Sequence, residues 1–158
     1  MKITKNWLRK RHACRGGMDW TLARYPNGVQ ASELVEALWD VDSTWAAWVV
    51  ARWSDAPGAL VKLLAGDDDW RVREIIAKRP RLSAAIVERL AGDADSWVRA
   101  AIAQRPRLSV ALVERLAGDA DWYVRAAIAE RPRLSAAVVR LLAGDAEQYV
   151  RAAIAKRS

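Results

Sequence analysis

The sequence of 158 residues contains no phenylalanine, one cysteine and one histidine. The single cysteine, Cys14, excludes a disulfide within the chain and any metal or iron–sulfur site built from several cysteines. The longest apolar run, Trp45–Ala51, is too short to cross a bilayer, and the N-terminal segment lacks the apolar stretch of a signal peptide. These absences predict a cytoplasmic protein.

What the sequence does contain is typical of a globular chain. Hydrophobic residues make up 53% and charged residues 28%, and a chain of this length can bury a core of its own. The aromatic residues are nine tryptophans and three tyrosines.

Positive charge is concentrated at the N-terminus. The net charge is +7, and residues 1–17 hold six basic residues and no acidic one, whereas the other 141 residues hold 20 basic and 19 acidic ones. We expect residues 1–12 to form a basic arm that either binds phosphates, acidic lipids or acidic proteins, or only aids solubility. Its candidate binding residues are Lys2, Lys5, Arg9, Lys10 and Arg11.

A repeat of 26 residues occupies most of the chain. We expect residues 13–38 to form divergent capping helices and residues 39–158 to form the repeats. The expected copies are a degraded one at 39–64, three close ones at 65–90, 91–116 and 117–142, and a partial one at 143–158.

Each copy carries signals that delimit two short helices. Asp95 is predicted to cap a first helix, Pro106 to end it, and Ser109 to cap a second helix. Gly118 is predicted to adopt a left-handed conformation after the second helix. Because helices of about ten residues are marginal alone, each pair needs its neighbours. The pattern therefore predicts an all-α solenoid of stacked helical pairs.

The period and motif together resemble one repeat family. Twenty-six residues is shorter than tetratricopeptide, ankyrin or HEAT repeats, and the strand pattern of ordinary leucine-rich repeats is missing. Residues 92–116 read G-D-x-D-x-x-V-R-x-x-I-A-x-R-P-x-L-S-x-x-L-V-x-x-L, which resembles the leucine-rich repeat variant family. The resemblance implies a right-handed, HEAT-like superhelix of short helices, without the cysteine-rich cluster domain of the founding member. Residues Ala13–Leu38 resemble an N-terminal module of uncharacterised bacterial and phage-related repeat proteins.

No residue set predicts an active site, a metal site or a cofactor. His12 and Cys14 lie two residues apart, but the sequence offers no third ligand or orienting group. Gly16-Gly17 lacks the strand and the G-K-[ST] sequence of a phosphate loop. The aspartates recur at the same place in each copy, so helix capping explains them better than cation binding.

Two arginine series recur with the repeat. The first follows a core valine, as Arg99 follows Val98, and is predicted to form a ladder with the capping aspartates. The second flanks the prolines and forms either a solvated edge or a rail for phosphates and acidic side chains. Its members proposed for binding are Arg79, Arg81, Arg105, Arg107, Arg131 and Arg133.

Positions that differ between the copies are candidates for protein contacts. The variable positions place Trp70 and Trp122 on the outward side of the first helix. In the next column, an aromatic residue is followed four residues later by alanine, which predicts that Trp97, Tyr123 and Tyr149 are packed. The proposed protein-binding residues are Trp70, Trp122, Lys78, Gln104 and Glu130.

The final copy has a first helix without a second. Val150 and Ile154 are therefore predicted to be partly exposed and to form a docking face for a partner or for a second copy of the chain.

Together these features favour a non-catalytic solenoid that binds a protein. One version is an inhibitor, encoded by a phage or mobile element, that blocks a host or defence complex. The alternative is nucleic-acid binding through the basic arm and the arginine-lined edge, and an enzyme is the least supported reading.

Overall fold

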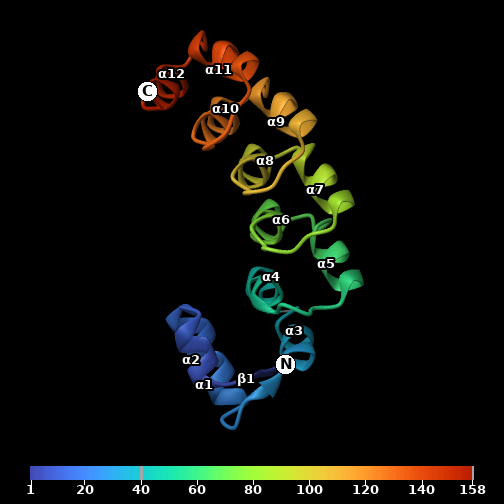
Figure 1. The fold of residues 1–158 in the computed structure, drawn as a ribbon. Helices are drawn as coiled ribbons and strands as arrows, with labels where there is room; N and C mark the ends of the chain where they lie inside the picture. Colours follow the sequence, from blue (N-terminus) through green and yellow to red (C-terminus); the bar gives the residue numbers. More distant parts are fainter. Residues whose placement is uncertain (40, 158) are drawn as a thin grey trace. The chain divides into compact units, whose positions relative to one another are not determined.

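The computed structural model describes residues 1–39 and 41–157, and these residues form two compact units, Met1–Arg81 and Leu82–Ser158. Within the described residues there are twelve α-helices and a single two-stranded ribbon (Figure 1). The prediction of an all-α fold built from short helical repeats is confirmed.

The first unit begins with a short antiparallel ribbon and continues as helices. Ile3 pairs with Val29 in the ribbon. The elements are β1 (Lys2–Ile3), α1 (Lys5–Lys10), α2 (Arg15–Arg24), β2 (Val29–Gln30), α3 (Ala31–Trp39), α4 (Ser43–Arg52), α5 (Gly58–Leu64) and α6 (Trp70–Ala77).

Residues 1–12 are folded into the first unit, so the prediction of a basic arm is wrong. The side chain of Ile3 is fully buried and that of Leu8 nearly so. The Ala31 N–H also donates a hydrogen bond to the carbonyl oxygen of Met1, at 2.8 Å. The physical reason is that two apolar side chains in a basic segment are enough to anchor it when a neighbouring strand supplies backbone partners.

The second unit consists of helical pairs in two layers. The first helices α8, α10 and α12 form one layer, and the second helices α7, α9 and α11 form the other (Figure 1). Their bounds are α7 (Ala84–Ala91), α8 (Ser96–Ala103), α9 (Val110–Ala117), α10 (Trp122–Ala129), α11 (Ala136–Ala143) and α12 (Gln148–Ala155).

The predicted helix boundaries are confirmed. The Oδ1 of Asp95 accepts a hydrogen bond from the Trp97 N–H at 2.9 Å, at the start of α8. That helix ends at Ala103, shortly before Pro106. The Oγ of Ser109 then accepts from the Leu112 N–H at 3.2 Å and caps α9.

The left-handed turn predicted at Gly118 is wrong. Its φ is −100°, in the ordinary negative range. The Gly118 N–H donates to the Arg115 carbonyl and the Asp119 N–H to the Leu116 carbonyl. Both bonds join residues three apart, so the helix ends in a tightened turn that no left-handed residue has to complete.

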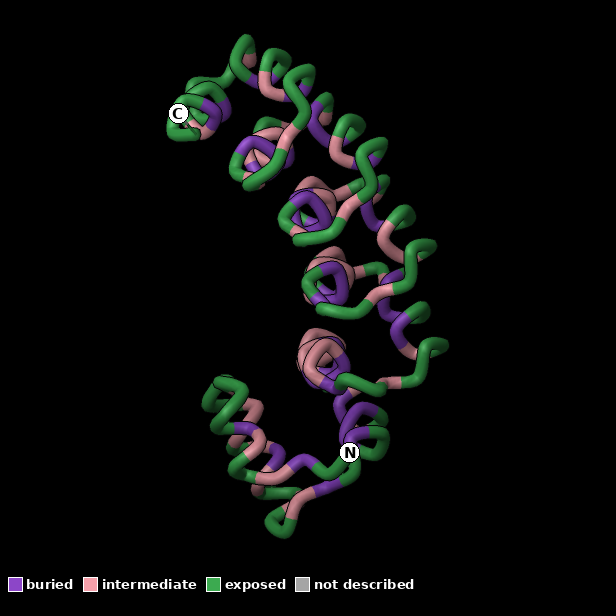
Figure 2. Tube along the Cα trace, in the orientation of Figure 1, coloured by how far each residue is buried: buried purple, intermediate pink, exposed green. Residues whose placement is uncertain are grey.

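The core of the second unit lies between its two layers. Val98 and Ile102 from α8 are fully buried, and Leu112 and Leu116 from α9 are at least 97% buried. Figure 2 shows the buried stretches of these helices where the layers meet. Burying such a side chain fully contributes about 1.5–3 kcal/mol, so this interface holds the short helices in place.

The C-terminal docking face predicted at Val150 and Ile154 is also wrong. Val150 is fully buried and Ile154 is 8% exposed, because α12 packs against both α10 and α11. The preceding helical pair alone covers both side chains. The apolar surface that α12 does expose is Tyr149, which is 72% exposed.

Candidate recognition surface

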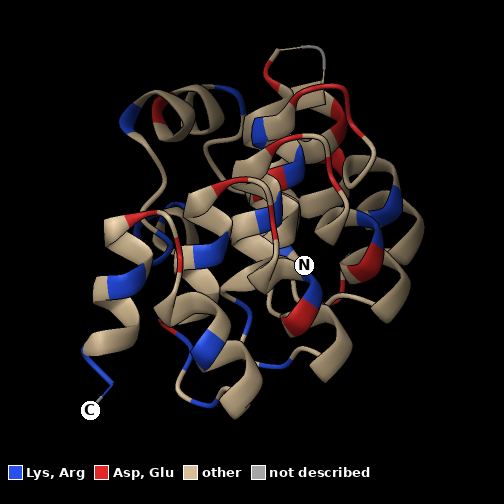
Figure 3. Cartoon of the chain, turned by 90° about the horizontal axis from the view of Figure 1, so that it is seen from above, with Lys and Arg blue, Asp and Glu red and all other residues tan. Residues whose placement is uncertain are grey.

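The first arginine series forms a ladder within the second unit, but its carboxylate partners are Asp119 and Asp145 and not the predicted capping aspartates. Arg99 reaches both carboxylate oxygens of Asp119, each at 2.8 Å, and its Nη1 donates to the carbonyls of Asp93 and Ala94. Arg125 repeats the geometry one copy later, with Asp145 at 2.7 and 2.9 Å. Figure 3 shows acidic loops next to helices that carry basic residues. Each bridge ties a first helix to the loop that begins the next repeat.

These bridges shift the pKa of the carboxyl groups that accept them. Hydrogen bonds from Arg125 hold the pKa of Asp145 below its ordinary value. For Asp119, burial acts to raise the pKa, but hydrogen bonds from Arg99 and from the Asp121 N–H leave it lowered overall. The folded state therefore binds these protons less readily than the unfolded state does. The stabilisation is present above the unfolded pKa of about 4 and is lost as the pH falls through the lower folded pKa.

Replacing Asp145 with asparagine should remove part of this acid sensitivity. We expect the free energy of unfolding at neutral pH to fall by about 1–2 kcal/mol, because a charged, bidentate partner of Arg125 is lost. Urea denaturation at several pH values should also show a shallower loss of stability below about pH 4. Asp19→Asn, at a surface pair with Arg15, is the control and should match the parent. An unchanged pH dependence in Asp145→Asn would contradict the assignment.

The second arginine series is divided between structural and exposed positions. The Arg79 side chain is buried and donates hydrogen bonds to the carbonyls of Val50, Ser54 and Arg81. Arg131 donates to the Ala103 carbonyl at 2.7 Å. These guanidinium groups fill the carbonyl-rich ends of first helices from the preceding repeat. Arg79 and Arg131 are therefore not part of a free rail, and that part of the prediction is wrong.

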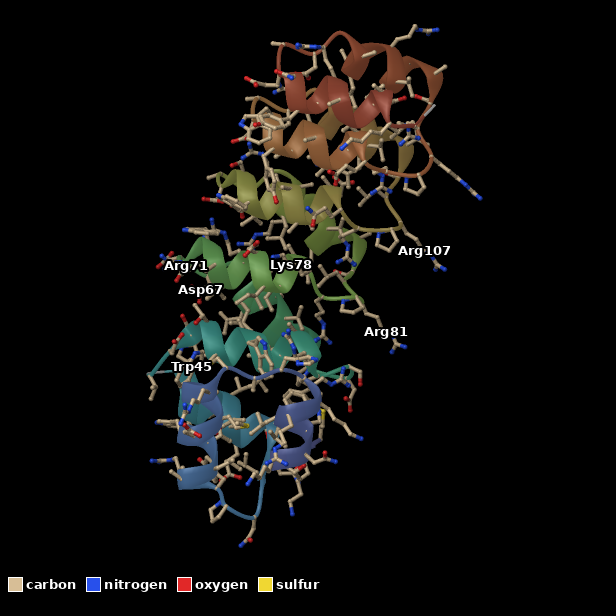
Figure 4. All side chains as sticks on the ribbon, turned by 90° about the vertical axis from the view of Figure 1, so that its left-hand side faces the viewer. Trp45, Asp67, Arg71, Lys78, Arg81 and Arg107 are labelled. Atoms are coloured by element: carbon tan, nitrogen blue, oxygen red, sulfur yellow. The ribbon has the colours of Figure 1, made fainter. Side chains whose placement is uncertain are left out.

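The remaining members of the series are more accessible. Arg81, Arg107 and Arg133 are exposed, and Figure 4 shows Arg81 and Arg107 each pointing away from its own loop. Arg105 is half-buried, and burial lowers its pKa, as it does for Arg79 and Arg131. Only the residues that follow the prolines remain candidates for contact with an anionic partner.

Four aromatic rings form a continuous row across the first helices of the second unit. Trp97 lies 4.7 Å from Tyr123, measured between ring centroids, and Tyr123 lies 5.8 Å from Trp122. Trp122 in turn lies 5.6 Å from Tyr149. Trp97, Trp122 and Tyr149 are 49%, 41% and 72% exposed. We call Trp97, Trp122, Tyr123 and Tyr149 the aromatic row.

The prediction that this column is packed is wrong for Trp97 and Tyr149. Trp97 is the second residue of α8, two positions after the cap Asp95. Helical side chains lean toward the N-terminus, so a side chain in the first turn projects beyond the layers that bury later residues. In the sequence, the signal for this exposure is the position of Trp97 only two residues after the capping Asp95. Ala101 and Ala127, the alanines four residues after Trp97 and Tyr123, are buried. Their small side chains leave room for the aromatic rings to stack on one another.

A hollow of about 440 Å³ lies beside the aromatic row, between α10 and α12. Trp122 and Tyr149 line one end, and alanines such as Ala126 and Ala152 line the middle. Glu130 and Lys156 line the other end. An apolar hollow with charged groups at one edge suits an amphipathic segment of another protein.

Comparison with known families supports the repeat assignment. Residues 70–95 match the leucine rich repeat variant family. The resemblance inferred from the repeat motif is confirmed. Residues 1–55 match the YdhT N-terminal domain. No curated protein and no solved structure matches the sequence.

The other predicted protein contacts are distributed over both units. Trp70, the first helical residue of the leucine rich repeat variant match, is half-buried, and the Arg71 guanidinium lies over its ring at 5.5 Å. Lys78 is exposed but pairs with Glu74 at 2.6 Å. Gln104 and Glu130 are exposed in the second unit. Trp122 is exposed and belongs to the aromatic row, whereas Trp70 is half-buried. Trp122 is therefore the better candidate for a protein contact.

The YdhT N-terminal domain match contains the basic residues proposed for an arm. Their side chains are exposed on β1, on α1 and just after α1. They are Lys2, Lys5, Arg9, Lys10 and Arg11. Folding of this segment fixes these residues on one structured unit, whereas they were predicted to lie on a basic arm.

Cys14 and His12 have local structural roles in the same domain. The Sγ of Cys14 accepts a hydrogen bond from the Gly17 N–H and caps α2, and His12 has a left-handed φ of 56°. In the described parts of the chain, no three His, Cys, Asp or Glu side chains are grouped to hold a metal ion. Among those same residues, no helix is both long and apolar enough to cross a membrane.

Proposed function

We propose that this chain is a non-catalytic scaffold that recognises a protein partner through the aromatic row of the second unit. The observation that carries the proposal is the exposure of Trp97, Trp122 and Tyr149 in one connected set of rings. Helical repeat families commonly present such extended surfaces to partners. The leucine rich repeat variant match supports this scaffold role.

The aromatic row is preorganised for binding. Tryptophan and tyrosine dominate binding hot spots because they bury a large area with few rotatable bonds. Contacts between the rings already restrict the side chains before a partner arrives, which reduces the entropy lost on binding. Removing exposed apolar rings from water then supplies the driving force. Gln104 and Glu130 are placed to contribute polar contacts nearby.

Replacing Trp122 with alanine tests the proposal. A partner is first captured from the native host with the immobilised parent protein, and its affinity is then measured by calorimetry for parent and variant. We expect Trp122→Ala to weaken binding at least tenfold, as hot-spot truncations of about 1.4–2 kcal/mol do. Its effect on stability should stay below about 1 kcal/mol, because the side chain is substantially exposed.

Leu141→Ala is the matched control. Leu141 is 56% exposed but belongs to α11, in the other layer of the same unit. Removing it should leave the affinity unchanged. If both variants bind the captured partner as tightly as the parent does, the aromatic row is not the recognition surface.

A further inference from the structure

The first unit contains a groove whose charged lining residues are all basic. The groove has a volume of about 620 Å³ and lies between the end of α1, the C-terminal half of α4 and the loop after α6. Lys78 lies near the end of α6, and Arg81 extends from the loop that follows (Figure 4). The basic side chains that line it are Arg11, Arg52, Lys78, Arg79 and Arg81. We call this the basic groove.

The charges of the basic groove are only partly compensated. Within the described residues, Lys78 pairs with Glu74, and no carboxylate lies within 4 Å of the charged groups of Arg11, Arg52 or Arg81. Burial, and secondarily the charge of Arg11, lower the pKa of Arg52. Asp55 offsets part of the charge of Arg79, whereas the like charges of Arg11 and Arg52 lie near one another without a paired carboxylate and oppose folding. Such an arrangement is typical of a surface that binds an anion.

The guanidinium groups are also held in position. Arg52 donates to the carbonyl of Trp48 at 3.3 Å, and its guanidinium lies 4.2 Å from the Trp48 ring centroid. The Trp48 ring is braced by the edge-on contact with Trp7, at 5.8 Å. Arg79 is fixed by its carbonyl partners and contributes its field to the groove. A positioned arginine loses less entropy on contacting an oxyanion than a mobile one does.

We propose that the basic groove binds the phosphate backbone of a single-stranded nucleic acid. Several cations in one hollow match the repeated, regularly spaced charge of a phosphate chain better than the single charge of one acidic side chain. A flexible single strand can enter a concave surface, whereas a duplex presents a convex one and reaches only the rim. The exposed cations of α1, on the same unit, raise the local potential further. This site is independent of the aromatic row.

The test uses the full chain and a fluorescein-labelled oligothymidylate of about 15 nucleotides, a length suited to single-strand sites. Fluorescence anisotropy at several salt concentrations should show binding that weakens steeply with salt. In Arg11→Gln/Arg81→Gln, both altered side chains are exposed, so the fold should persist. We expect at least a tenfold loss of affinity at low salt. The slope against log salt should flatten by about 1.4, at about 0.7 per lost phosphate contact.

Arg89→Gln/Arg140→Gln is the matched control, because it removes the same charge from exposed positions of the second unit. It should retain the parent's affinity and salt slope, and so should Trp122→Ala, which separates this site from the proposed protein-binding one. Absence of binding at low salt would overturn the proposal, as would parental binding by Arg11→Gln/Arg81→Gln. Equal competition by a polyglutamate of the same length, or equal binding of a duplex, would overturn it as well.

Discussion

Replacing Arg79 with alanine is expected to lower the free energy of unfolding by about 3 kcal/mol or more. Arg79 is 5% exposed, and its guanidinium donates to the carbonyls of Val50, Ser54 and Arg81. Hydrogen bonds to a charged group contribute about 1.5–3 kcal/mol. Without Arg79, the Val50 carbonyl keeps the Trp53 N–H as a donor but loses its charged one. The substitution also leaves a cavity where the aliphatic part of the side chain was packed.

The measurement is urea denaturation of parent and variant, followed by circular dichroism and by tryptophan fluorescence. Arg81→Ala is the control, because Arg81 is exposed two residues away and should change stability by less than about 0.5 kcal/mol. The half-buried Arg131 should give an intermediate loss, since it donates to carbonyls at the corresponding place two repeats later. A variant at Arg79 as stable as Arg81→Ala would show that the carbonyls are satisfied without it.

The two arginines around Pro80 also differ in a way that the sequence alone does not predict. The sequence places Arg79 and Arg81 symmetrically around Pro80, and composition alone makes both of them surface residues. The fold separates them, because carbonyls near the end of α4 lie within reach of Arg79 and not of Arg81. A repeat sequence shows which residues recur in each copy. Which of these residues becomes structural depends on whether it reaches the unpaired carbonyls at the end of the previous helix.

Local signals were predicted more reliably than long-range ones. The caps at Asp95 and Ser109 depend on residues two or three positions away, so the sequence contains all the information they need. The pairing of β1 with β2 joins residues far apart in the chain, through strands of only two residues each. Strands that short have no recognisable alternation, and the basic composition around them suggested a basic arm.

The sequence predicted an outward position for Trp122 but not for Trp97 and Tyr149, because their exposure also depends on neighbouring helices. The pairing of an aromatic residue with an alanine four residues later predicted a packed column. It did not indicate which side of that column faces solvent. Trp97 lies in the first turn of α8, where the layers no longer cover the helix. Exposure at helix ends depends on how far neighbouring helices extend, which a single-repeat pattern does not encode.

Gly28 links the β1–β2 ribbon to the rest of the first unit, and alanine there should destabilise it by about 2–4 kcal/mol. Gly28 has a φ of +85°, which disfavours any residue with a Cβ, and a Cβ built there would lie 2.7 Å from the carbonyl oxygen of Ile3. Relieving that contact requires the backbone of β1 to move away from β2, and this movement would expose the fully buried Ile3 side chain.

Gly58→Ala is the matched control for this substitution, because it adds the same methyl group where no heavy atom lies within 4 Å of the new Cβ. Gly58 is the first residue of α5, so alanine there should be neutral or should stabilise the protein by up to about 1 kcal/mol. Urea midpoints of the two variants should therefore move in opposite directions. Hydrogen exchange supplies a local readout, since the Ala31 N–H donates to the Met1 carbonyl and should exchange faster in Gly28→Ala alone. Equal midpoints, with the Ala31 amide protected in both variants, would mean that β1 accommodates the methyl group and that the N-terminal segment is held by α1 instead.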